Sequence, residues 1–231
     1  IYTNLNTLSL HDALPISDVV GSTQIKTEDR GTLPALLHEL LREIAQCRPE
    51  LKLQVDIFRG DSFQVWVEKP ECAPLVALLL RAGLRMSALR AGEQQLDARI
   101  SVGIGDVAYR DATVSQSDGE AFVLSGRGFD QLGKQQRLMV QTPSETTNEE
   151  LRVETAFVDD IVSNWSALHS KIMYQALLYE TSQGELAEKN STSQQNVRKR
   201  LEKAKVKLIR MYLDRVSSLI ISEQNKRNNQ P

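Results

Sequence analysis

The 231-residue chain lacks the features that mark a membrane protein, a zinc protein or a disulfide-stabilised protein. Its longest apolar stretch, residues 75–84, contains an arginine and is shorter than the roughly 18 apolar residues of a membrane span. The two cysteines, Cys47 and Cys72, form no spacing motif and are expected to be buried free thiols of a reducing cytoplasm. His38 and His169 are isolated histidines, and no Ser-His-Asp set or glycine-rich phosphate loop of the P-loop type is present. These absences predict a cytoplasmic protein with no membrane partner.

The N-terminal segment differs from the rest of the chain. Translated in one frame, a widely used short-read sequencing adapter gives Ile-Tyr-Thr, some index-dependent residues, and then Thr-Leu-Ser-Leu-His-Asp-Ala-Leu-Pro-Ile-Ser. These match residues 1–3 and 7–17, and the index covers residues 4–6. Segments of foreign origin are set aside before a fold is interpreted. We therefore interpret residues 1–17 as an adapter artefact, so that native sequence begins at Asp18; an ordinary N-terminal extension is the alternative.

The spacing of apolar residues in the remaining chain predicts alternating strands and helices, with a tight hairpin at Arg59–Ser62. The order strand-helix-strand-strand-helix-strand is that of a ferredoxin-like βαββαβ unit. Ile1–His11 is expected to pack loosely, and Ala13–Ser17 to take the place of a missing first strand. Gly103 and Gly105 would let another segment approach closely. The expected elements are a strand ending at 18–20, a helix at 32–47, strands at 54–58 and 63–67, a helix at 70–89, a strand at 99–108, a helix at 120–132 and a strand at 137–141.

Two domains are expected: an α+β domain and, after it, an all-α domain. The α+β domain would cover residues 18–141. The polar and acidic stretch 142–150 has no periodicity and is expected to be a linker. Residues 151–224 would form the helical domain, and residues 225–231 a frayed tail.

Two aspartates are expected at one edge of the sheet, because Asp18 ends the first strand and Asp61 lies at the hairpin tip beside it. Neighbouring carboxylates repel each other unless a cation lies between them, and Mg²⁺ prefers oxygen ligands. The pair is therefore a candidate metal site for nucleotide chemistry. Gly21, Ser22 and Thr23 would supply N–H and hydroxyl groups to phosphate oxygens. The alternative is that both aspartates only stabilise turns, where aspartate is common.

Four segments resemble a known family: DVVGST, FRGDSFQVWV, RISVGIGDV and SDGEAFVLSGRGFDQL, in this order. Their order is similar to that of the class III nucleotidyl cyclase catalytic domain, and more closely to the bacterial SatD family, from Asp18 to about the C-terminus. RGDSFQ and GEAFVLSGRG are the more specific parts. The resemblance implies a nucleotide ligand and metal ions bound by the aspartates that match Asp18 and Asp61.

The chain departs from the cyclase pattern at two positions. Arg127 matches a transition-state arginine, but Val123 stands where an asparagine is expected four residues earlier. Ile57 replaces a purine-reading lysine. Because phosphoryl transfer depends on positioning and charge neutralisation, these losses argue against an enzyme. A nucleotide would then be a bound signal, with Arg59 and Arg127 as the cations for its phosphates; a plain surface arginine is the alternative for Arg127.

Residues 181–208 predict a helix-turn-helix. Ser182 and Glu185 can form a capping box, and Ser193 suits the start of a second helix. Basic residues outnumber acidic ones from Lys189 to Arg227, although the net charge of the whole chain is only −2. One face of the second helix is apolar, at Val197, Leu201, Ala204 and Leu208.

The opposite face of that helix carries the predicted contacts with double-stranded DNA. The stretch resembles the helix-turn-helix of sigma-like and response-regulator DNA-binding domains, in which the second helix enters the major groove. Glutamine and arginine suit adenine and guanine edges, and lysine suits phosphates. The predicted DNA-binding residues are Gln194, Gln195, Arg198, Lys199, Lys203 and Lys207. The alternative is a three-helix bundle that packs on the first domain or on a partner.

A later apolar stripe, formed by Tyr212, Val216, Leu219 and Ile220, would pair two chains into a homodimer. The sequence therefore predicts a bacterial DNA-binding regulator with a nucleotide- and Mg²⁺-sensing domain. A metal-dependent nucleotide-processing enzyme with an accessory helical domain and a non-catalytic interaction module are the alternatives.

Overall fold

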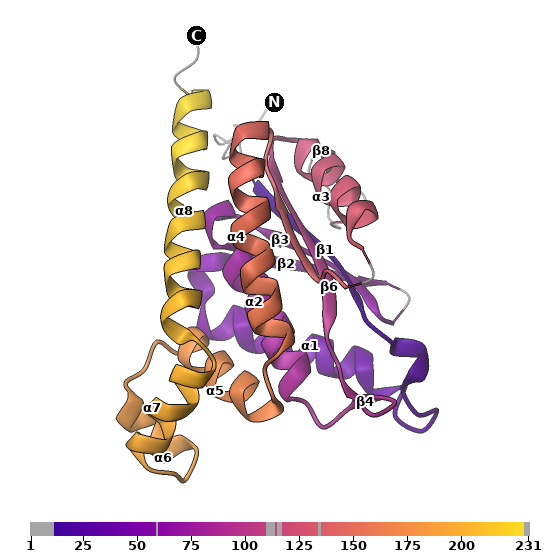
Figure 1. The fold of residues 1–231 in the computed structure, drawn as a ribbon. Coiled ribbons are helices and arrows are strands. Elements are labelled where there is room, and N and C mark those ends of the chain that lie inside the picture. The colour runs from indigo at the N-terminus through magenta and orange to yellow at the C-terminus, as the bar shows by residue number, and fades with distance from the viewer. Residues whose placement is uncertain (1–11, 59, 110–113, 115–116, 134, 229–231) are drawn as a thin grey trace, which may run out of the picture.

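The computed structural model describes residues 12–58, 60–109, 114, 117–133 and 135–228 (Figure 1). The expectation for residues 1–11 lies outside the described residues. The helices are α1 (Thr32–Cys47), α2 (Ala73–Met86), α3 (Glu120–Gln131), α4 (Glu145–Ser163), α5 (Ala167–Leu178), α6 (Gln183–Lys189), α7 (Gln194–Lys203) and α8 (Val206–Asn228). The main strands are β1 (Asp12–Val19), β2 (Leu53–Phe58), β3 (Ser62–Val67), β6 (Ala98–Gly105) and β9 (Leu138–Gln141). Short strands are β4 (Arg90–Ala91) with β5 (Gln94–Gln95), and β7 (Val107–Tyr109) with β8 (Asp118–Gly119).

The five main strands form one sheet in the order β2-β3-β1-β6-β9. β1 is antiparallel to both β3 and β6, and β9 adds in parallel to β6 at one edge. The main elements β1, α1, β2, β3, α2 and β6 follow one another in the expected βαββαβ order, and α3 and β9 come after them. α3 covers one face, and α1 and α2 cover the other (Figure 1). The sequence prediction missed the two short hairpins, β4–β5 and β7–β8.

β1 lies at the centre of the sheet and pairs with β6 along its whole length, from Asp12 opposite Gly105 to Val19 opposite Ala98. Ala13–Ser17 therefore occupies the place of a first strand, as expected. Pro15 lies within this central strand, where a residue without an N–H group is uncommon. The sequence of the segment is thus unusual for its position, which agrees with the interpretation of residues 1–17 as adapter-derived; that interpretation stays a prediction.

The stretch expected to be a linker is mostly helical. Residues 145–150 are the first turns of α4, and the Ser144 side chain caps them by accepting a hydrogen bond from the Thr147 N–H group. The polar residues that suggested a loop are therefore capping residues. One apolar cluster includes residues of the sheet, α2, α4, α5, α7 and α8, so the α+β half and the helical half share a core.

Two further expectations need correction. Residues 225–228 are not a frayed tail, because α8 continues to Asn228 and Arg227 donates to Glu120 Oε2 at 2.8 Å. Cys47 is exposed rather than buried, and Cys72 is half-buried. Among the described residues, no helix has the length and apolar character that a bilayer crossing requires.

A buried ionic network joins α2 to β6 and α4. Arg81 is 0 % exposed and donates to both carboxylate oxygens of Asp97 at 2.8 Å. It also donates to Asp159 Oδ1 at 2.7 Å and to Ser163 Oγ at 2.9 Å. Arg85 adds a second bond to Asp97 Oδ2 at 2.9 Å. Buried charges are tolerated when they are paired and hydrogen-bonded in this way.

Two glycines bring α3 close to β6, which confirms the expectation for Gly103. A Cβ atom at Gly103 would lie 2.2 Å from the Ala121 carbonyl oxygen and 2.4 Å from the Ser125 nitrogen. On the helix side, a Cβ atom at Gly128 would lie 2.4 Å from Ser101 Oγ. The distance between α3 and the sheet is therefore set by the absence of side chains on both surfaces.

We predict that Gly103→Ala lowers the free energy of unfolding by about 1–3 kcal/mol, because α3 has to move away from β6. Gly126→Ala is the matched control in the same helix, since a Cβ atom there meets nothing within 4 Å. It should be neutral or stabilising by about 0.5–1 kcal/mol, as alanine is the better helix former. Urea unfolding of the three proteins checks this, and equal stability of the two variants would contradict the packing described.

We predict that Asp97→Asn lowers the free energy of unfolding by about 3–5 kcal/mol at pH 7, because it leaves buried guanidinium charge without its partner. Burial raises the pKa of Asp97, but Arg81 and Arg85 lower it more, so the folded-state pKa lies below the ordinary value. The stabilisation is therefore complete above the unfolded-state pKa of about 3.9 and is lost as the pH falls through the folded-state pKa.

Urea unfolding at neutral and acidic pH measures this difference. Asp130→Asn, at an exposed position of α3, is the control and should change stability by less than about 0.5 kcal/mol. A gap between wild type and Asp97→Asn that widens on acidification would show that Asp97 is not held as a carboxylate.

Candidate functional site

Asp18 and Asp61 lie at the same edge of the sheet, as the topology predicts. Asp18 pairs in register with Ser62, the residue after Asp61. The Val19 N–H group also donates to the Asp61 carbonyl oxygen at 2.9 Å. The two aspartates are thus at the ends of neighbouring strands, and the carbonyl group of Asp61 is hydrogen-bonded to the residue that follows Asp18.

Asp18 is bound by an arginine that the sequence prediction did not single out. Arg99 Nε donates to Asp18 Oδ1 at 3.0 Å, and Arg99 Nη2 donates to Oδ2 at 2.5 Å. The guanidinium group also lies 5.0 Å from the centre of the Phe129 ring in α3. The hydrogen bonds to Asp18 raise the pKa of Arg99. Arg99 lies near the start of β6, directly opposite Asp18 in the strand pairing, and only this pairing identifies it as the partner.

The turn after β1 is tied to the hairpin by Ser22, whose hydroxyl group donates to Asp61 Oδ2 at 2.6 Å. Gly21 precedes it with a φ of 70°, which is the left-handed region that favours glycine. Thr23 is exposed, and its carbonyl oxygen accepts from Arg30 Nη2 at 2.5 Å. In this arrangement the Ser22 hydroxyl group is hydrogen-bonded to a carboxylate of the protein itself.

Of the two predicted phosphate-binding arginines, Arg59 lies outside the described residues. Arg127 is exposed on α3, beside Gly128, which faces the sheet. Val123, in the preceding turn of α3, is also exposed, and Ile57 is half-buried in β2.

The carboxylate oxygens of the suggested Mg²⁺ site are hydrogen-bonded to protein donors in this structure. Both oxygens of Asp18 accept from Arg99, and one oxygen of Asp61 accepts from Ser22. Within the described ranges, no group of three or more His, Cys, Asp or Glu side chains is placed to hold a metal ion. The positive charge that two neighbouring carboxylates require is supplied here by a guanidinium group.

A second candidate site is the outer face of α7. The predicted capping box at Ser182 and Glu185 is observed, and Ser193 caps α7 by accepting from the Asn196 N–H group. A turn containing Ser191, with a φ of 47°, separates α6 from α7. All predicted DNA-binding residues are exposed: Gln194, Gln195, Arg198, Lys199 and Lys203 on α7 and Lys207 on α8.

The apolar face of α7 is shorter than the sequence suggested. Val197, Leu201 and Ala204 are buried, but Leu208 is 48 % exposed. α7 ends at Lys203, Lys205 has a φ of 61°, and α8 begins at Val206. The break changes the direction in which later side chains point, so the predicted stripe does not extend to Leu208.

The predicted dimer stripe on α8 is occupied within the chain. Tyr212, Val216 and Ile220 are 5 %, 0 % and 1 % exposed. The Tyr212 hydroxyl group lies 3.0 Å from Thr155 Oγ1, and α8 packs along α4 (Figure 1). These side chains are therefore part of the core, and the expectation that they pair two chains is wrong.

Comparisons with known proteins give a partial likeness to solved cyclase structures. No protein-family model matches the chain, and no curated protein matches it. The adenylyl cyclase CyaB from P. aeruginosa is 17% identical, with 56% of this chain and 76% of that chain covered and a TM-score of 0.38. An adenylate cyclase from Trypanosoma brucei is 14% identical, with 59% and 75% covered and a TM-score of 0.41. At these values, function has to be argued from the residues themselves.

We predict that Mg²⁺ gives no saturable increase in the melting temperature of the wild-type protein, because Arg99 already neutralises Asp18. Arg99→Met should lower the free energy of unfolding by about 1 kcal/mol or less, since the ion pair is partly exposed to solvent. Thermal unfolding at increasing MgCl₂, with Asp18→Asn as the matched variant, measures both. A saturable Mg²⁺ effect that Asp18→Asn abolishes would show that the carboxylates bind the metal.

Proposed function

We propose that this protein binds double-stranded DNA through the exposed face of α7, and that its α+β half regulates this binding. The observation that carries the proposal is the division of α7 into two faces. One face is buried in the core, and the other presents two glutamines, an arginine and two lysines to solvent. An amphipathic helix with such a polar face, preceded by a helix and a short turn, suits the major groove.

The orientation of α7 is fixed at both ends, which favours a recognition role. At the N-terminal side, Asn190 Nδ2 donates to Gln175 Oε1 of α5 at 2.6 Å. At the C-terminal side, Trp165 Nε1 donates to the Ala204 carbonyl oxygen at 3.0 Å. A helix held in this way can present its side chains to base edges with little loss of conformational freedom on binding.

The charges on this surface suit a polyanion. Burial, together with the positive charges of Lys203 and Arg200, lowers the pKa of His169 on the adjacent α5. Arg198 donates to Glu202 at 2.8 Å, but both side chains are more than half exposed. Such a surface pair contributes little stability, so a guanine or a phosphate can replace the glutamate.

The edge at Asp18 and Asp61 supports a second candidate, a nucleotide-processing enzyme. The hydrogen-bonded turn at Ser22 beside two carboxylates is the supporting observation. This candidate requires Arg99 to release Asp18, because metal-assisted phosphoryl transfer needs carboxylate oxygens on the ion. A nucleotide that binds without turnover would leave the regulator proposal intact.

An interaction module is the third candidate, and exposed apolar side chains support it. Phe157 of α4 is 70 % exposed, and Met211 of α8 is 56 % exposed. This candidate is favoured if neither DNA binding nor nucleotide turnover is found.

We predict that the protein binds duplex DNA more weakly as salt increases, and that Arg198→Ala weakens binding by about 1–3 kcal/mol. Lys203→Ala should reduce the slope of log K against log salt by about 1, because it removes one phosphate contact. Fluorescence anisotropy with random-sequence duplex over a range of salt concentrations measures both effects.

Arg42→Ala is the charge-matched control, because Arg42 is exposed on α1 rather than on α7. It should leave the affinity and the salt slope unchanged. The proposal fails if the wild type does not bind duplex at low salt, or if Arg42→Ala and Arg198→Ala weaken binding equally. Turnover of nucleoside triphosphates that depends on Asp61 would favour the enzyme candidate instead.

A further inference from the structure

Four large apolar side chains are exposed on α4 and α8, and we call them the apolar patch. Val153 and Phe157 of α4 are 55 % and 70 % exposed, and Leu208 and Met211 of α8 are 48 % and 56 % exposed. The two helices pack side by side on the outside of the molecule (Figure 1). Single exposed apolar residues are common on protein surfaces, but a group of them indicates an interaction site.

Contacts between the two helices place the members of the patch at one level. Arg215 of α8 donates to Glu150 of α4 at 2.5 Å, and the hydroxyl groups of Thr155 and Tyr212 lie 3.0 Å apart. Residue numbers therefore rise along α4 as they fall along α8, so the helices are antiparallel. Phe157 comes after Thr155 and is thus level with the first turns of α8, which carry the two exposed apolar residues of that helix.

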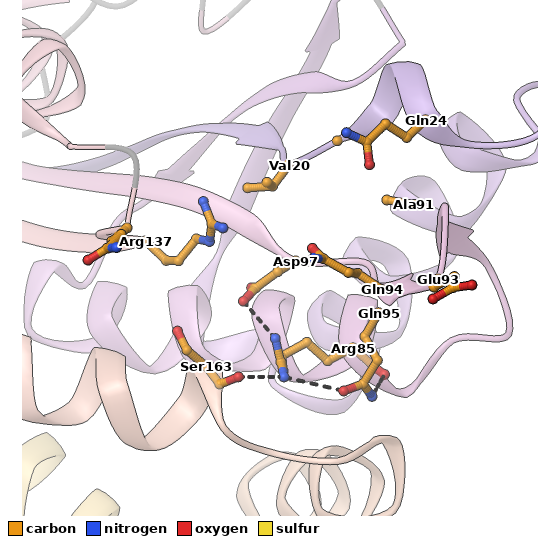
Figure 2. Close-up of a pocket in the computed structure, with 12 residues that line it drawn as sticks. Val20, Gln24, Arg85, Ala91, Glu93, Gln94, Gln95, Asp97, Arg137 and Ser163 are labelled. Carbon is orange, nitrogen blue, oxygen red and sulfur yellow. Dashed lines mark hydrogen bonds and ion pairs between the residues drawn. The ribbon is translucent and has the colours of Figure 1, made fainter.

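α4 is held in place by buried arginines, so its side of the patch is preformed. Arg85 Nη2 donates to the carbonyl oxygen of Ser163, the last residue of α4, at 2.7 Å (Figure 2). Arg81 donates to Asp159, one turn earlier, at 2.7 Å. A surface on a fixed helix loses little conformational freedom when a partner binds.

The charges beside the patch differ in sign between the two helices. Residues 203–210, which include the first turn of α8, contain four basic residues and no acidic residue. The exposed charged residues along α4 are mostly carboxylates: Glu145, Glu149, Glu150 and Asp160, with Arg152 as the base. Nucleic acid and anionic lipid repel an acidic helix, so neither suits the whole patch. A second copy of this chain offers both charges, each beside exposed apolar side chains.

We propose that two copies of this chain form a dimer through the apolar patch, with α4 of each copy against α8 of the other. A two-fold axis parallel to the helices gives this arrangement and keeps every residue at its own level. Phe157 of one copy then contacts Leu208 and Met211 of the second copy. An axis perpendicular to the helices would instead place α4 on α4 and α8 on α8, where like charges repel.

This arrangement also gives Lys207 a partner. Lys207 lies four residues before Met211 on one face of α8, and Asp160 lies three residues after Phe157 on α4. Both side chains are exposed, and the Asp160 carboxylate accepts a hydrogen bond from the neutral amide of Asn164. Because the two residues lie at the level of the apolar contacts, Asp160 of one copy and Lys207 of the other form an ion pair at the rim.

The dimer goes beyond the proposed function and does not depend on it. Lys207 was predicted from the sequence to contact DNA, and the dimer gives it a protein partner instead. The exposed polar residues of α7 that carry the proposed function are not part of the patch, so the dimer is tested without DNA.

Sedimentation equilibrium of the full chain tests the proposal. We expect a monomer–dimer equilibrium at micromolar concentrations, because the patch is small. Phe157→Ser should weaken dimerisation about tenfold or more, since the dimer loses two central aromatic side chains. Ile221→Ser is the matched control, because Ile221 of α8 is 43 % exposed outside the patch, and it should dimerise like the wild type. Both positions are exposed, so both variants should keep the wild-type melting temperature.

Two results would overturn the dimer proposal. One is a wild-type protein that stays monomeric up to about 100 μM. The other is an equal effect of Phe157→Ser and Ile221→Ser on association, which would show that the patch is not the contact surface.

Charge reversal tests the pairing of α4 with α8. Asp160→Lys and Lys207→Asp should each weaken dimerisation severalfold at low salt, because like charges then face each other. The protein with both substitutions restores opposite charges and should dimerise within about twofold of the wild type. If the double variant is weaker than either single variant, the pairing of α4 with α8 is wrong.

Discussion

The hydrogen bonds of Arg81 constrain the whole molecule. Its guanidinium group is fully buried and donates to Asp97 at the start of β6 and to Asp159 and Ser163 in α4. Because a buried charge is stable only when its donors are satisfied, α2, β6 and α4 hold fixed relative positions. Asp159 extends this constraint to β9, since its Oδ2 accepts from the Arg137 N–H group. The helical half is thereby joined to the sheet by ionic contacts as well as by apolar packing.

A guanidinium group also dominates the edge where a metal site was expected. Asp18 and Asp61 meet there as the topology requires, but Arg99 lies against Asp18 and Phe129. A divalent ion and an arginine both supply the positive charge that neighbouring carboxylates require. At this edge the Arg99–Asp18 contact therefore joins β1 to β6 in addition to the backbone pairing of the two strands.

Most of the fold could be predicted from the sequence, because local patterns determine it. The helix at 32–47 and the hairpin strands follow from apolar periodicity, and the close approach at Gly103 follows from missing side chains. The errors arose where distant residues decide the structure. Residues 142–150 look like a loop until α4 packs against β9, and the Leu208 stripe failed because the backbone turns at Lys205. At the candidate site the aspartates were placed correctly, but Arg99 becomes their partner only through strand pairing across the sheet.

Hydrogen bonds at both sides of α7 connect it to neighbouring elements. Asn190, at the end of α6 before the turn to α7, is bound to Gln175, and Ala204 at the end of α7 is bound to Trp165, which belongs to the turn that Arg85 binds. Since α5 and this turn fix α7, its orientation can change only if the turn moves relative to α2. Packed cores change between discrete arrangements rather than deforming continuously, so a small movement of Arg85 can shift α7 as a unit.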